Sequence, residues 1–496
     1  MSKYILTIDA GTTSERAIIF NKSGHIVGVS QIEFQQFFPK PGWVEHDAEE
    51  IWTIQKKTIT DVLKKFEIKS SDIEAIGITN QRETTIVWNR KTGKPIHKAI
   101  VWQDRRTADF CEKLKLKGLE SFIQQKTGLL IDAYFSASKI KWLLDSVPGA
   151  RELAETGNLV FGTVDCWLLW NLTQGQVHAT DVSNASRTML YNINDMKWDK
   201  ELLTLFEIPQ IMLPKVKPSS HNYGLVHKGH FGHPIPISGI AGDQQSALFG
   251  QMCIDSGMVK STYGTGCFLI MNTGPKIIRS KNKLLSTIAW QIGKNVTYAL
   301  EGSIFMGGAL IKWLRDNLKI IKSASEIEAL AKTVTESGGV IFVPGFVGLG
   351  APHWDPYGTG TLIGINRSTS QGHIARAALE AIALQNLDIL DTMEKDSEIK
   401  IKELRVDGGA AANNLLLQIQ ASISKIDIIR PKVIETTAQG VAFLAGLATG
   451  YWKNLEEIKK IWESDKVFNP QLDKNMDILR KNWSKAIERS KKWHSE

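Results

Sequence analysis

The strongest constraint on the fold is a strand–turn–strand pattern that occurs twice, roughly half a chain apart. A β-favouring run at residues 4–8 ends in Asp9-Ala10-Gly11-Thr12-Thr13 and continues into a second run at 16–20. The pattern returns at residues 262–266, between runs at 259–263 and 268–272. Two such glycine–threonine turns predict two domains of related design that face one ligand. Because 496 residues exceed the roughly 250–300 of a single core, we place the domains at 1–250 and 251–496.

The remaining pattern is typical of an α/β protein. Further strands are predicted at 73–79, 84–88, 99–102, 234–239, 340–343 and 404–406. Apolar residues at helical spacing predict helices at 304–318 and 378–390, between those strands. Strands and helices mixed in this way indicate sheets that are covered by helices.

Charge and composition exclude several classes of function. The net charge of +8 comes from 60 basic and 52 acidic residues that are mixed along the chain, and no nucleic-acid-binding motif is present. No apolar run of about 18 residues occurs, so we expect no membrane insertion. The four scattered cysteines and the lack of a signal peptide are typical of a cytoplasmic protein.

The two turns are candidate phosphate-binding loops. Gly11 allows backbone N–H groups to approach an anion, Asp9 ends the first strand where it could face hydrated Mg²⁺, and Arg16 adds a positive charge. The hydroxyl donors are Thr12, Thr13 and Ser14 in the first loop and Thr265, beside Gly264, in the second. A Walker A loop is absent. Each turn alone is equally well explained as a plain hairpin, but two together favour phosphate binding.

Small residues at two predicted helix starts could admit a nucleotide. Gly308 stands near the start of one helix, and residues 405–414, which include Gly409 and Asn413, run from a strand into another. Glycine there permits close approach to helix N–H groups. The alternative is a close-packed strand–helix turn without a ligand.

Two further segments could carry the chemistry. Asp243 lies between a predicted strand and helix, where it could accept a proton from a hydroxyl group or simply cap the helix through the N–H of Ser246. Arg82 and Glu83 interrupt a β-favouring region and could bind neighbouring hydroxyls or form a surface salt bridge. Trp102 and Tyr134 could form an apolar wall behind such a ligand or belong to the core.

These segments resemble the FGGY carbohydrate kinases along the chain from residue 4 to about 450. The matching segments, in family order, are DAGTTSERAIIF, PGWVEHD, GITNQRETTIVWNRKTGKPI, AIVWQDRR, TDVSNASRTML, ISGIAGDQQSALFGQ, STYGTGCFLIMNTG, GLGAPHWDP and RVDGGAAANN. GITNQRET together with GDQQSALFGQ is much more specific than any glycine-rich loop.

The resemblance implies a fold, a reaction and a set of site residues. The fold is two actin-like, ribonuclease-H-like α/β domains with the active site in the cleft between them. The reaction is the transfer of the γ-phosphoryl group of ATP to glycerol, with Mg²⁺, in a homodimer or homotetramer. By resemblance, the residues that bind glycerol are Arg82, Glu83, Trp102, Tyr134, Asp243, Gln244 and Phe268. Those that contact the nucleotide are Thr12, Thr13, Ser14, Arg16, Gly264, Thr265, Gly308, Gly409 and Asn413. Asp9 and Asp243 lie near the metal, and Asp243 is the general base.

Two alternatives stay open. One is a kinase for another small polyol or a ketose, although the Arg82-Glu83 pair with Trp102 favours a short polyol. The other is a non-catalytic actin-like nucleotide switch, which the joint presence of Asp9, Thr265 and Asp243 disfavours.

Overall fold

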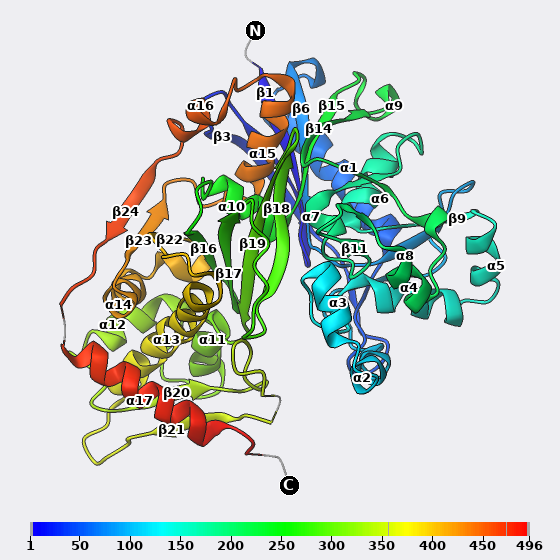
Figure 1. Cartoon of the computed structure of the whole chain (residues 1–496). Coiled ribbons are helices and arrows are strands. Elements are labelled where there is room, and N and C mark those ends of the chain that lie inside the picture. Colours follow the sequence, from blue (N-terminus) through cyan, green and yellow to red (C-terminus); the bar gives the residue numbers. More distant parts are fainter. Residues whose placement is uncertain (1–2, 356, 473, 494–496) are drawn as a thin grey trace.

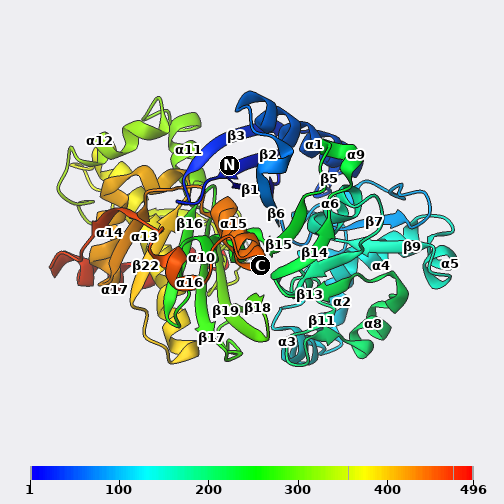
Figure 2. The same ribbon diagram turned by 90° about the horizontal axis from the view of Figure 1, so that it is seen from above.

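The computed structural model describes residues 3–355, 357–472 and 474–493 and forms two α/β lobes that lie side by side (Figures 1 and 2). Within the described residues, one 13-stranded sheet runs through both lobes. The two halves of this sheet meet only between β14 and β18, where a single bridge pairs Ser220 with Ile292. The α/β architecture and all of the strands that the sequence predicts are present.

The first lobe is built on the N-terminal half of the sheet. Its strands, in spatial order, are β14 (Ser220–Leu225), β15 (Pro236–Gly242), β6 (Ile73–Asn80), β1 (Tyr4–Ala10), β2 (Ser14–Phe20) and β3 (Ile26–Glu33). Strands β1, β6 and β15 are parallel, and residues 5–10 of β1 are buried. Their near-continuous apolar sequences are those of strands that are covered on both faces.

Helices and short sheets surround this half. The helices are α1 (Ala48–Lys65), α2 (Ala108–Leu116), α3 (Glu120–Thr127), α4 (Ser136–Ser146), α5 (Ala150–Glu155), α6 (Val164–Leu172), α7 (Val182–Ala185), α8 (Lys200–Phe206) and α9 (Lys228–Phe231). The short sheets are β4 (Gln36–Phe37) with β5 (Glu45–His46) and β8 (Ala99–Ile100), β7 (Ile86–Asn89) with β9 (Leu159–Gly162), β10 (Ala179–Asp181) with β13 (Lys215–Lys217), and β11 (Tyr191–Asn192) with β12 (Lys197–Trp198).

The second lobe repeats the plan with the other half of the sheet. Its strands, in spatial order, are β24 (Ser464–Phe468), β23 (Asp427–Pro431), β22 (Glu403–Asp407), β16 (Met258–Tyr263), β17 (Cys267–Gly274), β19 (Asn295–Ile304) and β18 (Leu285–Ile292). Around it lie α11 (Gly308–Asp316), α12 (Ile327–Ala331), α13 (Gln371–Ser397), α14 (Asn414–Ser424), α17 (Lys474–Ser490) and the β20 (Ile341–Pro344)–β21 (Gly360–Ile363) pair. Helix α16 (Leu455–Lys459) instead packs its Ile458 in one cluster with Ile5 and Ile18 of the first lobe.

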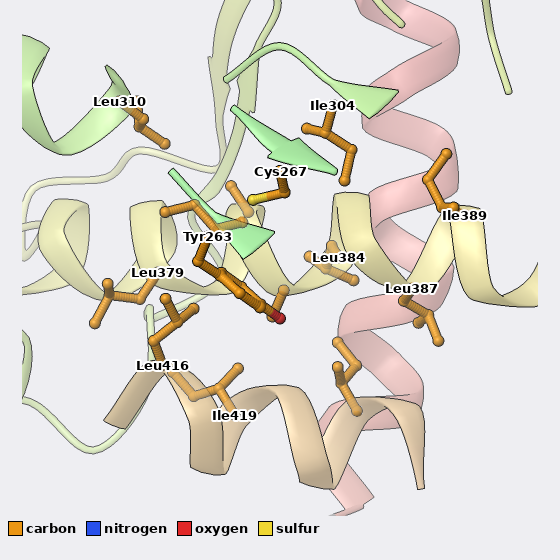
Figure 3. Close-up of a cluster of buried hydrophobic side chains, with 14 of the residues drawn as sticks. Tyr263, Cys267, Ile304, Leu310, Leu379, Leu384, Leu387, Ile389, Leu416 and Ile419 are labelled. Carbon is orange, nitrogen blue, oxygen red and sulfur yellow. The ribbon is translucent and has the colours of Figure 1, made fainter. Parts of the chain in front are cut away.

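The core of the second lobe anchors the β16–β17 hairpin. Figure 3 shows Tyr263 and Cys267 of this hairpin among leucine and isoleucine side chains of α13 and α14. The Tyr263 hydroxyl also donates a hydrogen bond to Oε1 of Gln420 on α14, at 2.8 Å. The buried end of the hairpin fixes the position of the turn at residues 264–266.

Two helices cross between the halves of the sheet. Helix α10 (Asp243–Gly250) packs against α15 (Thr436–Thr449), which comes from the C-terminal part of the chain but also contacts β1, β6 and β15 of the first lobe. A Cβ atom at Gly440 would lie 1.8 Å from the carbonyl oxygen of Ser246. Only glycine at this position permits the close crossing.

One predicted helix boundary is wrong. The helix predicted at 304–318 begins at Gly308, because Ile304 is the last residue of β19. Ile304 and Leu310 both pack in the same core. Apolar residues at the end of the strand and in the following helix therefore have the sequence spacing that is expected of a single helix. In the described part of the chain, no helix is long and apolar enough to cross a membrane.

Candidate active site

Asp9 and Asp243 lie at the same edge of the sheet of the first lobe. In the register of the sheet, Asp9 pairs with Thr79 of β6, and Thr79 pairs with Ala241 of β15. Since β6 separates the other two strands, the ends of β1 and β15 lie about 10 Å apart. Carboxylates at this spacing can approach one ligand from two sides.

Asp243 is the first residue of helix α10. Its side chain does not accept the N–H of Ser246, so the helix cap that the sequence analysis gave as the alternative is not formed. Its Oδ1 accepts the N–H of Gln244 at 2.7 Å and lies 3.1 Å from Nε of Arg82. The side chain remains 33% exposed, whereas that of Arg82 is 2% exposed. Desolvation by the surrounding atoms raises the pKa of Asp243, although Arg82 opposes that effect. A carboxylate with a raised pKa is a better proton acceptor.

Arg82 belongs to a buried group of charges that draws on both lobes. Its guanidinium donates to both carboxylate oxygens of Glu301 on β19, at 2.5 and 3.0 Å. Arg187, which follows α7, donates to Glu301 at 3.0 Å and to Glu83 at 2.6 Å. Although burial opposes ionisation, Arg187 and Arg82 hold the pKa of Glu301 at about 2. Glu301 is therefore a fixed negative charge.

Lys260 adds a third cation to this group of charges. Its pKa is lowered by desolvation, while Asp407 and Asp243 oppose that effect. With this lysine ionised, three positive groups lie among four carboxylates: Arg82, Arg187 and Lys260 among Glu83, Glu301, Asp243 and Asp407. The side chain of Lys260 also donates to Oε1 of Gln244, at 2.7 Å, and so orients a predicted substrate-binding residue.

Glu83 has an unusual backbone. Its φ of 60° lies in the left-handed region, and the residue is 1% exposed. Such a conformation in a buried, non-glycine residue persists only when the surrounding structure enforces it. Here the bond from Arg187 holds the carboxylate, so the strain and the ion pair fix the same side chain.

Aromatic side chains connect this group of charges to the first loop. The Tyr134 hydroxyl accepts from Nη2 of Arg82 at 3.4 Å, and the Tyr134 and Trp102 rings meet edge to face at 5.6 Å. The Trp102 indole donates from Nε1 to Oγ1 of Thr12 at 3.1 Å. Phe268 lies on β17, on the face of the sheet that carries Glu301, because Ile270 pairs with Glu301 and Phe268 with Ser303.

The first loop is held from behind by a neutral polar layer. Gln81 donates to the carbonyl of Gly11 at 2.9 Å, and Gln36 donates to the carbonyl of Thr12 at 3.0 Å. Burial lowers the pKa of His46 to about 4, and this neutral ring donates to Gln36 at 2.7 Å. These amides take up the loop carbonyls without adding a charge of their own.

Arg16 is ion-paired in a way that the sequence does not suggest. It pairs with Asp9 and also, at 2.6 Å, with Glu435, which comes just before α15. Desolvation raises the pKa of Asp9 despite its pairing with Arg16. Arg16 therefore connects the first loop to α15 and offers a positive group beside Thr13 and Ser14.

The second loop packs against the start of α11. The N–H of Gly308 donates to the carbonyl of Gly264 at 2.8 Å, and that of Ala309 donates to Thr265 at 3.0 Å. A Cβ at Gly409 would meet nothing within 4 Å, so open space lies in front of this backbone. Asn413 caps α14 by accepting the N–H of Leu416 at 2.9 Å. Gly264, Thr265 and Gly308 thus form one backbone surface, with Gly409 after the neighbouring strand β22.

Sequence reasoning missed Arg187, Glu301, Lys260 and Glu435. Arg187 stands inside the matching segment TDVSNASRTML, and Glu301 and Lys260 are single charges inside apolar strand sequences. A lone charge at a buried strand position was the available signal, because burial without a partner is costly.

The two α/β lobes, with an exposed carboxylate and two glycine–threonine turns beside their junction, match the architecture of carbohydrate kinases. The models for the N-terminal and C-terminal domains of the FGGY family of carbohydrate kinases match residues 4–250 and 259–449. The chain belongs to this family.

Individual relatives are similar over their full length. The glycerol kinase of Paraburkholderia phytofirmans is 59% identical over 99% of both chains, and that of Rhodopirellula baltica is 60% identical over 99% of this chain and 91% of its own. The crystal structure of Plasmodium falciparum glycerol kinase with ADP has a TM-score of 0.95 at 39% identity and covers 99% of this chain and 98% of its own. A gluconate kinase from Lactobacillus acidophilus, with a TM-score of 0.87 at 24% identity, shares the fold. The predicted two-domain fold is confirmed.

Proposed function

We propose that this chain transfers the γ-phosphoryl group of ATP to a terminal hydroxyl of glycerol and so forms sn-glycerol 3-phosphate. The observation that carries the proposal is the position of Asp243, which is partly exposed, has a raised pKa, and is held by Arg82 beside Tyr134 and Trp102. The hydrogen bond from Trp102 to Thr12 connects this pocket to the first loop. Relatives that are named glycerol kinases, at up to 60% identity, support the choice of substrate.

Asp243 is the general base of this reaction. Its carboxylate accepts the proton of the glycerol hydroxyl while that oxygen bonds to the γ-phosphorus of ATP. The bond from the γ-phosphorus to the β–γ bridging oxygen breaks, and ADP leaves with the electron pair. The N–H of Gln244 and Arg82 fix the carboxylate, so the protein contributes mainly position and electrostatics.

Polar groups on one side and aromatic rings on the other suit a short polyol. Arg82 donates and Glu83 accepts hydrogen bonds, and these two residues pair with neighbouring hydroxyls. Asp243, Gln244 and the Tyr134 hydroxyl complete the polar side. Trp102 and Phe268 contact the carbon chain. The cations and carboxylates around Arg82 already pair with one another, which favours a neutral ligand, because a charged one would compete for those pairs.

The two loops hold the phosphates of ATP. Thr12, Thr13, Ser14 and Arg16 approach from the first lobe, and Gly264, Thr265 and Gly308 approach from the second. The open backbone at Gly409, beside Asn413, accommodates the nucleoside. Hydroxyl groups and backbone N–H groups at such turns bind phosphate in this way.

The donor set fits Mg²⁺. Magnesium is commonly bound by one or two carboxylates together with waters and substrate phosphates, and Asp9 and Asp243 are the carboxylates at this edge. Among the described residues no group of three potential metal-binding side chains occurs, as expected where phosphates and water supply the remaining ligands. When bound, Mg²⁺ neutralises charge on the transferring phosphates.

We also propose that the protein is located in the cytoplasm and forms a homodimer or homotetramer. All four cysteines are free and buried, which supports a reducing compartment. Full-length similarity to glycerol kinases supports a shared assembly.

Replacement of Asp243 tests the function. We expect Asp243→Asn to lower turnover by about 10²–10⁴-fold without lowering the unfolding midpoint, because the amide keeps the shape but cannot accept the proton. Turnover is measured as ADP formation with glycerol, xylulose and gluconate. The matched control is Asp316→Asn, at a carboxylate that is 55% exposed on α11.

The same assay separates the alternatives. Preference for xylulose or gluconate would identify another carbohydrate kinase. ADP formation that does not respond to any acceptor would indicate a nucleotide switch.

A further inference from the structure

A cavity of about 730 Å³ lies on the first lobe, apart from the candidate active site. Residues of β10, β13, β14 and the segment that follows α6 line it. None of the residues that line it belongs to the site described above. Volumes of roughly 300–1,000 Å³ are typical of pockets for small molecules.

The charge of the cavity is entirely positive. Arg90, Lys215 and Lys217 line it, and no aspartate or glutamate does. Among the residues that the structure describes, none of these three cations is within ion-pair distance of a carboxylate. Three uncompensated cations around one concave surface attract an anion, since low-dielectric walls focus their field.

Arg90 is held in place rather than neutralised. Its Nε donates to the carbonyl of Gly157 and its Nη2 to that of Ile211, both at 3.2 Å. These carbonyls fix the guanidinium plane and leave its charge and Nη1 available. An arginine that is oriented in advance loses little side-chain entropy when it binds a phosphate.

The other lining groups suit the organic part of a ligand. Trp170 is 8% exposed and lines the cavity, and its indole N–H has no hydrogen-bond partner within the described chain. The ring of Tyr223 faces that of His221 edge on, at 5.6 Å. Desolvation, and then Lys217, lowers the pKa of His221, so this ring is neutral near pH 7 and can donate or accept a hydrogen bond.

We propose that this cavity binds a small organic phosphate, with the phosphoryl group at Arg90, Lys215 and Lys217 and the organic body against Trp170 and Tyr223. The dimensions of the cavity decide against a nucleic acid. Binding to a polyanion relies on many phosphate contacts along an extended basic surface, whereas here three cations surround a single cavity.

The cavity is also connected to Asp243 through hydrogen bonds. Strand β10 ends at Asp181, which accepts from the hydroxyl of Ser183 at 2.9 Å and from that of Ser219 at 2.7 Å. The Ser183 hydroxyl in turn accepts the N–H of Gly242, the residue before Asp243, at 2.9 Å. A ligand that shifts β10 against β13 therefore acts on the residue that precedes the proposed base. This regulatory part rests on the proposed function, whereas the binding site does not.

Binding of phenyl phosphate to the full chain tests the site. Isothermal titration calorimetry would be run with saturating ADP and glycerol present, so that the proposed active site is occupied. We expect one saturable site per chain, with an affinity that falls at least tenfold in the Lys215→Glu/Lys217→Glu variant and also falls with rising salt. The control is Lys200→Glu/Lys228→Glu, at two exposed lysines of the same lobe outside the cavity.

Three results would refute the binding site. The first two are the absence of saturable binding and equal affinity in both double variants. The third is an oligonucleotide that binds more tightly than phenyl phosphate and whose binding the cavity substitutions abolish. For the regulatory part, we expect phenyl phosphate to change the KM or kcat of the wild type and of the control, but not of the cavity variant. Binding with unchanged kinetics would refute the regulation and leave the site standing. Because binding is measured apart from turnover, failure of the kinase assay would leave the binding result unchanged and would remove only the regulatory part, which rests on the proposed function.

Discussion

Glu301 offers the most demanding test of the site, because it is buried, comes from the second lobe, and pairs with two arginines of the first. Glu301→Gln removes one negative charge and almost no volume. The carboxylates that then remain near Arg82 are Glu83, at 3.8 Å, and Asp243, at 3.1 Å. The variant therefore leaves Arg82 and Arg187 without the carboxylate that both of them contact.

Two independent arguments give the magnitude. The pKa of Glu301 falls from 4.5 to about 2, which corresponds to about 3 kcal/mol of stabilisation at roughly 1.4 kcal/mol for each pH unit. Removal of one partner from a buried ion pair typically costs about 3–5 kcal/mol. We therefore expect Glu301→Gln to lower the free energy of unfolding by about 3–5 kcal/mol at pH 7.

The assay is guanidinium chloride unfolding followed by tryptophan fluorescence, with Glu456→Gln as a control at a carboxylate that is 74% exposed. Glu301→Asp, which keeps the charge, should lose less stability than Glu301→Gln. Because the folded pKa is depressed, the stabilisation is present above pH 4.5 and disappears as the pH falls toward 2. The gap between wild type and Glu301→Gln should narrow over the same range. A loss below about 1 kcal/mol, or a gap that does not depend on pH, would refute the reasoning.

Three further predictions concern other parts of the site. As the pH falls, kcat/KM should begin to drop above pH 3.8, because the pKa of Asp243 is raised and the protonated carboxyl cannot act as a base. A kcat/KM that stays constant down to pH 3.8 would contradict the role of Asp243 as the base. Glu15→Gln should stabilise the protein increasingly above pH 4.5, by up to about 1.4 kcal/mol for each pH unit, because the buried Glu15 has a raised pKa and neither of its oxygens has a described partner. If Glu15→Gln raised the thermal unfolding midpoint by the same amount at every pH, ionisation of Glu15 would not be the cause of the stabilisation. Gly440→Ala should destabilise by at least about 1–3 kcal/mol through the contact with Ser246, whereas Gly409→Ala, which has open space in front of it, should keep its unfolding midpoint and weaken ADP binding. Equal midpoints for the two glycine variants would show that the helix crossing tolerates a methyl group.

The parts of the fold that the sequence predicts are those that local patterns determine. The strand at 4–8 is nearly all apolar, and Gly11 permits the turn, so β1 and β2 follow from a few adjacent residues. Asp243 could be placed between a strand and a helix for the same reason. Whether it caps the helix or faces a ligand could not be decided locally, because the answer depends on Arg82, which is distant in sequence.

The contacts that complete the site are separated by hundreds of residues. Arg82 and Glu301 are 219 positions apart, and Arg16 and Glu435 are 419 apart. No periodicity or turn residue connects such pairs. The helix predicted at 304–318 was wrong at its start for a related reason, since Ile304 and Leu310 share a core without sharing an element.

The same long-range contacts restrict how the two lobes can move. A motion that separated Glu301 from Arg82 and Arg187 would leave two arginines without their main partner, at a cost of several kcal/mol. Helix α15 adds a second restraint, because Thr436 at its start donates to Asp407 of the second lobe at 2.7 Å while its later turns pack on the sheet of the first lobe. The lobes are therefore fixed together around Arg82 and along α15.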